Sequence, residues 1–357
     1  MHSTSSSHSS LPAALGFAAL GLLSLGLSAA PAQAQTQDLF ASNLYGGTIS
    51  RFAGTGSGTF STTAIPLSGG LNYPAGLAFD SRGNLFVANS AGSDSITEFA
   101  AGATPGTFGT GKVVLSGGGL NAPTGLAFDA RGDLFVGNAH DNSITEFAAG
   151  NTIGTFGAGT VALTGGGLNY PIGLAFDARG DLFAANGYGN SITEFAVGPS
   201  PGTFGNTTML TGGGLAEPYD LAFDARGNLF TSNAGGTTIT EFAFTPGAGI
   251  APGTFGAGIV AATGLNSPAG LAFDASGDLF VGSYNGGTIT KFAAGATPGT
   301  FGIGKVVETG LSTPAYLAFS PLPSVPVPEA STTVSLGLLL ALGLGGMVMA
   351  ARKRRKA

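Results

Sequence analysis

Residues Pro123 to Phe147 read P-T-G-L-A-F-D-A-R-G-D-L-F-V-G-N-A-H-D-N-S-I-T-E-F, and close variants of this stretch recur along most of the chain. Its L-A-F element begins at Leu77, Leu126, Leu174, Leu221, Leu271 and Leu317. The residue that follows each element is Asp80, Asp129, Asp177, Asp224, Asp274 and Ser320, which gives a period of 46 to 50 residues. A self-similar period of this length is typical of repeat folds and determines the architecture.

Each repeat predicts four short β-strands. G-L-A-F predicts the first strand, L-F-V the second, S-I-T-E-F the third, and β-branched runs such as Lys112 to Leu115 the fourth. Between the first two strands, D-x-x-G predicts a tight turn, because Asp caps the turn and Gly takes a positive φ without steric cost. P-G-T-F-G, at Pro105, Pro201, Pro252 and Pro298, predicts a turn before the fourth strand. Short strands without helical periodicity indicate an all-β fold.

The ends of the repeat region predict a closed ring. A repeat of roughly 40–50 residues with four strands is the size of one propeller blade. The region starts at Asp38-Leu39-Phe40, a second strand without a first, and leaves at Tyr316 to Phe319, a first strand without a second. We therefore expect a six-bladed β-propeller over residues 35–321. Its last strand should complete the N-terminal blade and remove an open sheet edge.

The pattern P-x-G-L-A-F-D-x-x-G-x-L-F-V-x-N, followed by I-T-x-F, resembles the NHL-repeat β-propellers. It is also similar to the related gluconolactonase-like and streptogramin-lyase-like six-bladed propellers. The resemblance covers roughly Asp38 to Phe319 and implies the fold. It implies no single function, because propellers serve as enzymes, lectins and scaffolds alike.

The N-terminus predicts a signal peptide over residues 1–34. Leu11 to Ala30 is nearly all Leu, Ala and Gly, and Ala32-Gln33-Ala34 matches an A-x-A cleavage site, so the mature chain should begin near Gln35. The first ten residues contain no Lys or Arg, which departs from the usual signal peptide. An uncleaved membrane anchor is the alternative.

The C-terminus predicts a second export signal. A Pro-rich linker over residues 322–331 contains Pro328-Glu329-Ala330, and residues 332–351 are twenty positions without a charge, enough for a helix that crosses a bilayer. The basic tail, residues 352–357, should stay cytoplasmic. This arrangement resembles the PEP-CTERM sorting signal of Gram-negative bacteria, although Ala330 stands where a second Pro is usual. A plain membrane anchor is the alternative.

The resemblance of the tail implies an exosortase-like processing enzyme as a partner and a place in an exopolysaccharide-rich envelope. We expect a precursor anchored in the inner membrane, with the propeller outside, that is then sorted to the cell surface or released. The propeller region holds eight Lys and Arg against eighteen Asp and Glu, because five of the 13 basic residues lie in the tail and Glu329 lies in the linker. This balance argues against a nucleic-acid partner. The chain has no cysteine, which excludes disulfide and thiolate chemistry.

A ring of asparagines at the end of the second strands is the first candidate site. Its members are Asn43, Asn89, Asn138, Asn186 and Asn233, with Ser283 in the remaining blade. In a propeller of this strand order, the loop after the second strand opens on the same face as the segment before the first. A polar funnel there would bind sugar hydroxyls, and Ca²⁺ only weakly because Asn carries no charge. The alternative is an amide that satisfies the backbone of a neighbouring loop. The aspartates that follow L-A-F are interpreted as turn residues.

The residues that break the repeat are the second set of candidates. Asp220 and Tyr316 replace the Gly of P-x-G-L, and Glu217 stands beside the same motif. His140, Tyr188 and Tyr284 are departures in the loops after the second strands. Because symmetry is the default of a repeat scaffold, these departures indicate a ligand site, and the alternative is drift under weak constraint.

Enzyme chemistry has little support in the sequence. His140 is the single His left after signal cleavage, and G-x-S-x-G and H-E-x-x-H are absent. The resemblance to gluconolactonase-like propellers implies a divalent ion held by Glu, Asn and Asp, for which Glu217, Asp220 and the asparagine ring are the available groups. We predict a non-enzymatic binding or matrix role, with a glycan or a surface protein as ligand and no cofactor. The alternative is a metal-dependent gluconolactonase-like hydrolase.

Overall fold

The computed structural model describes residues 36–56, 59–61, 65–152, 154–200, 202–247, 253–297 and 299–322. These residues form strands and turns, and none of them belongs to a helix that could span a bilayer. The predicted signal peptide with Ala32 and Ala34, the linker beyond Leu322 with Pro328-Glu329-Ala330, the membrane helix and the basic tail all lie outside the described residues.

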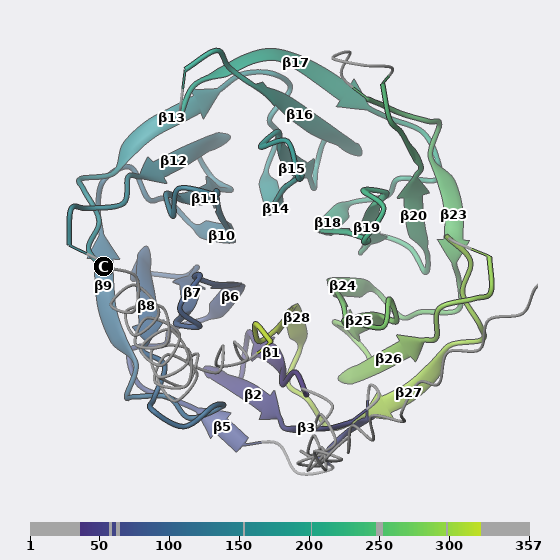
Figure 1. Ribbon diagram of the computed structural model, residues 1–357, viewed down its shortest axis with the longest axis horizontal. Helices are drawn as coiled ribbons and strands as arrows, with labels where there is room; N and C mark the ends of the chain where they lie inside the picture. Colours follow the sequence, from purple (N-terminus) through teal and green to yellow (C-terminus); the bar gives the residue numbers. More distant parts are fainter. Residues whose placement is uncertain are drawn as a thin grey trace, which may run out of the picture. The chain divides into compact units, whose positions relative to one another are not determined.

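Six antiparallel four-stranded sheets surround a central axis, which confirms the predicted six-bladed β-propeller (Figure 1). The first strands lie innermost: β6 (Pro74–Phe79), β10 (Pro123–Phe128), β14 (Pro171–Phe176), β18 (Pro218–Phe223), β24 (Pro268–Phe273) and β28 (Pro314–Phe319). The second strands are β1 (Leu39–Asn43), β7 (Leu85–Asn89), β11 (Leu134–Asn138), β15 (Leu182–Asn186), β19 (Leu229–Asn233) and β25 (Leu279–Ser283).

The outer half of each blade is formed by its third and fourth strands. The third strands are β2 (Thr48–Phe52), β8 (Ser95–Phe99), β12 (Ser143–Phe147), β16 (Ser191–Val197), β20 (Ile239–Phe242) and β26 (Thr288–Phe292). The fourth strands are β5 (Ile65–Leu67), β9 (Lys112–Ser116), β13 (Thr160–Thr164), β17 (Phe204–Leu210), β23 (Ile259–Ala262) and β27 (Lys305–Glu308). Two short hairpins were not predicted: β3 (Gly54–Gly56) with β4 (Thr59–Phe60), and β21 (Phe244–Thr245) with β22 (Thr254–Phe255).

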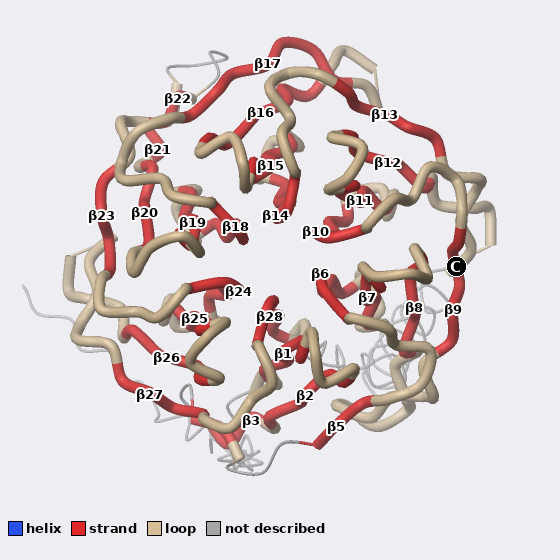
Figure 2. Tube along the Cα trace, turned by 180° about the vertical axis from the view of Figure 1, so that it is seen from behind, coloured by secondary structure: helices blue, strands red, loops and turns tan. Residues whose placement is uncertain are grey.

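The ring closes where the two ends of the propeller meet. β28 pairs antiparallel with β1, with Leu39 opposite Phe319 and Ala41 opposite Leu317. Beyond the ladder, the Ser320 N–H donates to the carbonyl of Asp38 at 2.9 Å, and the Asp38 N–H donates to Ser320 Oγ at 2.9 Å. Figure 2 shows β28 beside β1 in the innermost position of this blade. The predicted completion of the N-terminal blade by the last strand is therefore confirmed.

The P-G-T-F-G segment does more than form a turn before the fourth strand. Its Phe packs into the seam between two blades: the Phe255 ring lies 5.3 Å from Phe183 on the second strand of the preceding blade, at 76°. Phe183 also meets Phe223, on the first strand of the Phe255 blade, at 5.2 Å and 74°. Edge-to-face contacts of this kind are the preferred geometry of aromatic pairs. The corresponding seams hold Phe40–Phe79–Phe108, Phe86–Phe128–Phe156, Phe135–Phe176–Phe204, Phe230–Phe273–Phe301 and Phe280–Phe319–Phe60.

The D-x-x-G segments form capped turns on one face of the propeller. Asp129 Oδ1 accepts the backbone N–H groups of Arg131 and Asp133, each at 2.9 Å, and Arg131 Nε donates to Asp129 Oδ2 at 2.9 Å. Gly132 completes the turn with a φ of 86°. The same backbone contacts recur at Asp80, Asp177, Asp224 and Asp274. The interpretation of this aspartate ring as turn residues is confirmed.

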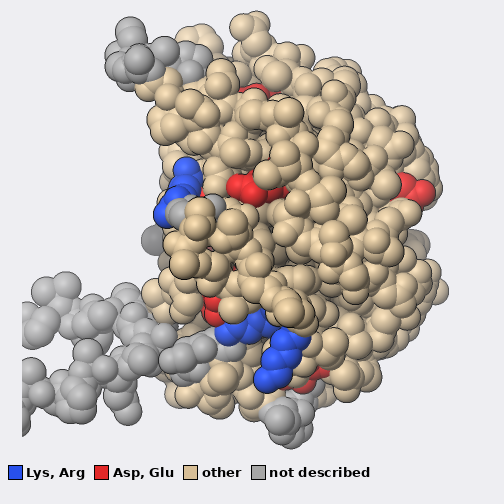
Figure 3. Space-filling model, turned by 90° about the vertical axis from the view of Figure 1, so that its right-hand side faces the viewer, with Lys and Arg blue, Asp and Glu red and all other residues tan. Residues whose placement is uncertain are grey.

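We call this side, where first strands end and second strands begin, the turn face. All the Lys and Arg among the described residues lie in its turns or at the strand ends next to them: Arg51, Arg82, Lys112, Arg131, Arg179, Arg226, Lys291 and Lys305. Figure 3 shows the propeller from the side, with blue Lys and Arg atoms at the left and in the lower centre of the view and red but no blue atoms at the right edge. Among the described residues, the basic side chains are therefore confined to the turn face, where most of the acidic ones also lie.

Candidate functional site

The face opposite the turn face carries every tyrosine of the chain. First strands begin and second strands end there, as the pairing of Pro123 with Asn138 shows. Tyr73 and Tyr170 directly precede a first strand, and Tyr219 and Tyr316 lie within the first three residues of one. Tyr45, Tyr188 and Tyr284 follow a second strand. We call this side the tyrosine face. Repeats that agree at the turn face differ here.

The residue before the strand-initial Pro is held in the left-handed region in every blade. These residues are Tyr73, Ala122, Tyr170, Glu217, Ser267 and Thr313, with φ between 47° and 58°. Hydrogen bonds hold this uncommon conformation in place: the Tyr170 N–H donates to Asn142 Oδ1 of the preceding blade at 2.6 Å, and its carbonyl accepts the Gly187 N–H at 3.1 Å. Such conformations persist where the surroundings determine them, and they cluster at functional sites. A position whose residue differs between repeats is thus presented on a backbone held by hydrogen bonds.

Aromatic contacts link most of this face. Tyr170 stacks on Tyr188 with ring centroids 4.3 Å apart, and the exposed His140 lies 6.2 Å from Tyr170. Tyr219 contacts Tyr284 at 6.4 Å. A second line of contacts joins Tyr219 to Tyr316, and Tyr284 to Tyr45 and on to Tyr73. The rings are thereby held against one another before any ligand arrives.

A cavity of about 330 Å³ lies among these rings. Three consecutive blades line it, with Tyr170, Ile172, Gly187 and Tyr188 from one, Glu217, Tyr219 and Ala234 from the next, and Ser267, Tyr284 and Asn285 from the third. We call this cavity the tyrosine pocket. Aromatic walls with a few polar groups are typical of ligand sites, whose volumes are roughly 300–1,000 Å³.

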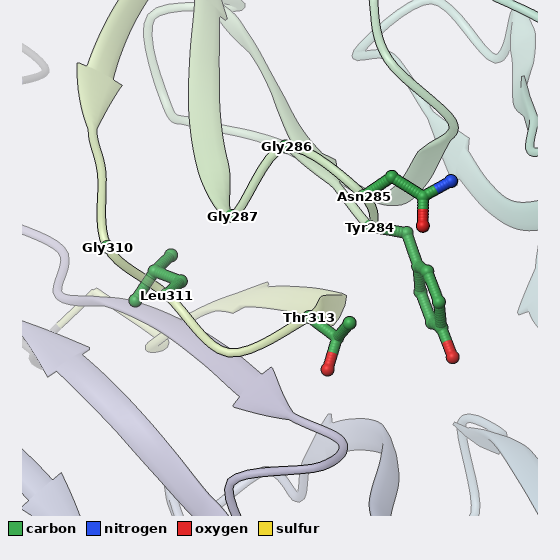
Figure 4. Close-up of a pocket in the computed structure, with 7 residues that line it drawn as sticks. All are labelled: Tyr284, Asn285, Gly286, Gly287, Gly310, Leu311 and Thr313. Atoms are coloured by element: carbon green, nitrogen blue, oxygen red, sulfur yellow. The ribbon is translucent and has the colours of Figure 1, made fainter.

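A second cavity of about 370 Å³ adjoins the tyrosine pocket and shares Tyr284 and Asn285 with it. Gly286, Gly287, Gly310, Leu311 and Thr313 complete its lining. Figure 4 shows Thr313 between Leu311 and the Tyr284 ring, with the Asn285 amide pointing away from Leu311. The Tyr284 hydroxyl donates to the Tyr45 hydroxyl at 3.0 Å, which fixes the shared wall. The two cavities together offer an extended site.

The central channel beneath the tyrosine face is closed by apolar side chains. A cavity of about 80 Å³ on the axis is lined by the six leucines of the L-A-F elements: Leu77, Leu126, Leu174, Leu221, Leu271 and Leu317. Tyr316 crosses the channel, and its hydroxyl donates at 3.0 Å to the carbonyl of Ile172, three blades away in a ring of six. A ligand in the tyrosine pocket would therefore lie at the mouth of the channel and not inside it.

Asp220 is the single carboxylate among the residues that line this axial cavity. It is 6% exposed, and its two oxygens accept the backbone N–H groups of Leu221 and of Leu271 in the next blade, each at 2.9 Å. Burial raises its pKa to about 7, while those two hydrogen bonds act in the opposite direction. Four blades have Gly at this position, where space is short: a Cβ on Gly173 would lie 2.6 Å from the Tyr219 carbonyl oxygen.

The raised pKa of Asp220 predicts a pH-dependent stability. Folding favours the protonated carboxyl, so this contribution is fully present below the unfolded pKa near 3.8 and is lost as pH rises to about 7. At roughly 1.4 kcal/mol per pKa unit, the loss is on the order of 4 kcal/mol. Urea unfolding at pH 4.5, 6 and 8 should show the wild type losing more stability with rising pH than Asp220→Gly. Parallel pH curves for the two proteins would contradict this assignment.

Four tyrosines of this face have a pKa above the ordinary value of a phenol. Burial raises the pKa of Tyr170, Tyr219, Tyr284 and Tyr316 above the ordinary value, with smaller contributions from neighbouring groups, chiefly other tyrosines. All four hydroxyls therefore stay neutral, and the rings keep the electron-rich faces of neutral phenols.

The asparagine ring lies inside the blades rather than in the funnel. Asn138 is fully buried; its amide donates to Ser143 and Thr145, and its carbonyl accepts the Asn121 N–H at 3.2 Å. Asn89, Asn186 and Asn233 make the equivalent contacts. Asn43 donates to Thr48 and Ser50, but its buried oxygen has no partner among the described residues. These contacts agree with the alternative interpretation, in which each amide satisfies the backbone groups of a neighbouring loop.

The residues that break the repeat come together instead. Tyr188, Glu217 and Tyr284 line the tyrosine pocket, Asp220 and Tyr316 line the axial cavity below it, and His140 lies beside Tyr170. Sequence reasoning missed Tyr170 and Tyr219 as site residues, together with Ile172, Ser267 and Asn285. The signal that would have found the face is the placement of all seven tyrosines before, or early in, a first strand or after a second strand.

Several solved structures share this fold at low sequence identity. A chain of the nidogen/laminin complex is 20% identical with a TM-score of 0.61, over 80% of this chain and 98% of that one. The periplasmic gluconolactonase of Pseudomonas aeruginosa is 17% identical with a TM-score of 0.56, over 80% and 99%. The virginiamycin B lyase of Staphylococcus aureus is 15% identical with a TM-score of 0.52, over 79% and 87%. At these levels of identity, the comparisons show a shared fold and nothing further.

No known family model matches the sequence, and no curated protein matches it either. The solved structures confirm the resemblance to NHL-like and gluconolactonase-like propellers at the level of the six-bladed architecture. Function has to be argued from the site.

The residues present do not fit the divalent-metal site that a gluconolactonase-like propeller implies. Among the described residues, no group of three or more His, Asp and Glu lies close enough to share an ion. Glu217 and Asp220 line different cavities, and both Asp220 oxygens already accept backbone N–H groups. The side-chain oxygens of four ring asparagines likewise already accept backbone N–H groups: Asn89, Asn138, Asn186 and Asn233.

Proposed function

We propose that this protein is a non-enzymatic binding propeller that takes a glycan ligand in the tyrosine pocket. One observation carries the proposal: residues that break a strict six-fold repeat converge with all seven tyrosines on a single face. Tyrosine rings offer flat apolar surfaces for the faces of sugar rings. Ser267, Asn285 and Glu217 supply hydrogen-bonding groups at their edges. The adjoining cavity behind Tyr284 gives room for more than one sugar unit.

The proposal places the propeller outside the cell. The support is the signal-peptide pattern of residues 1–34 and the PEP-CTERM-like tail, with an exosortase-like enzyme as processing partner and the inner membrane as first anchor. The eighteen acidic and eight basic residues of the propeller region suit an exposed surface protein. Fractionation of cells with an antibody against the propeller tests this placement, and recovery of the protein in the cytosol would contradict it.

A surface protein is the second candidate ligand. The chain of the nidogen/laminin complex, which shares 20% of its residues and has a TM-score of 0.61, supports this candidate at the level of the fold. A metal-dependent lactonase is the enzymatic alternative, supported in the same way by the gluconolactonase of Pseudomonas aeruginosa. A glycan is preferred to both because the pocket combines stacked rings with hydrogen-bonding groups, and because no set of three or more His, Asp or Glu residues converges in the part of the chain that the structure describes.

Immobilised neutral, acidic and amino sugars provide the direct test. The wild type should be retained by at least one class of glycan, and the variant Tyr170→Ala/Tyr188→Ala should lose at least roughly tenfold in affinity, the usual effect of removing central aromatic anchors. Tyr73→Ala is the matched control, because Tyr73 occupies the same left-handed position as Tyr170 but does not line the pocket. Ala122 is native at this position, so alanine is tolerated there. Equal retention of all three proteins would refute the pocket as the site.

A further inference from the structure

The tyrosine face has a one-sided charge. Among the described residues it carries Asp94 and Asp141 in the loops after β7 and β11 and Glu217 before β18, with Asp220 buried in β18 and Glu308 at the outer end of β27, whereas every Lys and Arg lies on the turn face. Asp94 and Asp141 each accept one hydrogen bond, from the Ala122 N–H and from Asn121 Nδ2. The Glu217 carboxylate is exposed, and no hydrogen bond or ion pair engages it in the part of the chain that the structure describes. This carboxylate is free to meet a ligand.

The pocket beside that carboxylate is walled by tyrosine rings. Tyr170 and Tyr188 form one stacked wall, and Tyr219 and Tyr284 contribute the other rings. The face of a neutral phenol attracts a cation through its quadrupole, and aromatic cages are the characteristic sites for ammonium groups. The Glu217 carboxylate adds a Coulomb attraction for the same cation. An anionic ligand would meet repulsion and no cationic partner on this face.

We infer that the ligand of the tyrosine pocket is an amino sugar with a free ammonium group, as in a chain of glucosamine units. This inference rests on the proposed glycan-binding function and names its substrate class. The ammonium group lies against the tyrosine rings and the Glu217 carboxylate, and the sugar ring stacks on the Tyr170–Tyr188 wall. The next unit of the chain passes over Tyr284 into the adjoining cavity. A lysine-rich peptide shares the charge but lacks the flat sugar face that suits the stacked wall.

Three tetrasaccharides with the same β-1,4 backbone isolate the ammonium group: glucosamine, N-acetylglucosamine and glucose tetramers, titrated calorimetrically into the full-length protein in detergent. The glucosamine tetramer should bind at least roughly tenfold more tightly than the other two, because only it makes the cation–π contact. Its affinity should fall with added salt and as the pH rises through the titration of the amine.

Matched variants separate the pocket from general attraction to an acidic protein. Tyr170→Ala should lose roughly tenfold in affinity for the glucosamine tetramer, whereas Tyr73→Ala should keep it. Glu217→Gln should lose roughly threefold to fivefold, and Asp141→Asn, which removes the same charge from the same face outside the pocket, should lose less. A tetralysine peptide should bind more weakly than the sugar and without dependence on Tyr170.

Each other outcome overturns the inference in a recognisable way. Equal, Tyr170-dependent binding of all three tetrasaccharides would remove the ammonium preference and leave the glycan-binding function standing. Binding of the glucosamine tetramer that survives Tyr170→Ala would be unspecific charge attraction. Tetralysine binding that equals the sugar in affinity and in its dependence on Tyr170 would assign the pocket to basic peptides. No binding of the glucosamine tetramer would also overturn the inference, while the retention experiment on glycans would still decide the proposed function.

Discussion

A chain that ends at Ser312 is expected to lose cooperative folding, because it lacks the strand that closes the ring. Without β28, β1 exposes an open edge, the axial cavity loses Tyr316 and Leu317, and the last aromatic seam loses Phe319. An unpaired inner strand of this kind is also a template for aggregation. The measurement is urea unfolding followed by circular dichroism, together with size-exclusion chromatography.

The matched control for this truncation ends at Leu322. It removes the same linker, membrane segment and tail but retains the ladder between β1 and β28 and the contacts of Ser320 with Asp38. This control should unfold in one transition as a monomer. If the chain that ends at Ser312 unfolded at the same urea concentration as the control, closure by β28 would not be what holds the ring together.

Phe183→Ala is expected to lower the free energy of unfolding by about 3–5 kcal/mol, the usual cost of removing a fully buried phenylalanine. Phe183 is 0% exposed and packs edge-to-face on Phe223 and Phe255, so the variant leaves a cavity in the seam between two blades. Phe183→Leu should lose less, because a leucine keeps most of the volume. Urea unfolding of purified variants gives these differences directly.

Tyr73→Ala serves as the aromatic control for the seam. Tyr73 is 44% exposed, and its ring contacts only Tyr45 among the described aromatic rings. Its loss should therefore stay within about 1 kcal/mol. A Phe183→Ala variant as stable as Tyr73→Ala would show that the aromatic seams do not hold the blades to one another.

The ring and its closure could be predicted because they depend on signals that repeat. The L-A-F and L-F elements determine the number of blades, and the incomplete repeats at Leu39 and Phe319 determine how the ring closes. The role of Phe255 could not be predicted in the same way, because its partner Phe183 lies in the preceding blade. A repeat compared with itself reveals which residues recur but not which blade they contact.

The candidate site was predicted in part, for a similar reason. Glu217, Tyr188 and Tyr284 were singled out as departures from the repeat, but their convergence depends on three blades meeting at the axis. The asparagine ring was weighed as a polar funnel, whereas Asn138 is fully buried and bonds to Ser143, Thr145 and the Asn121 N–H. Recurrence indicates that a residue matters to the scaffold, and departure from recurrence indicates the site.

The most direct test of the ligand site is a tyrosine-selective NMR titration. The chain has seven tyrosines, all on the tyrosine face, so ¹³C-labelled tyrosine reports on that face alone. On addition of glucosamine tetramer, we expect the ring signals of Tyr170, Tyr188, Tyr219 and Tyr284 to shift in a saturable way, while those of Tyr73 change little. If the tyrosine signals stayed in place at tetramer concentrations where calorimetry shows binding, the tyrosine pocket would not be the binding site of this protein.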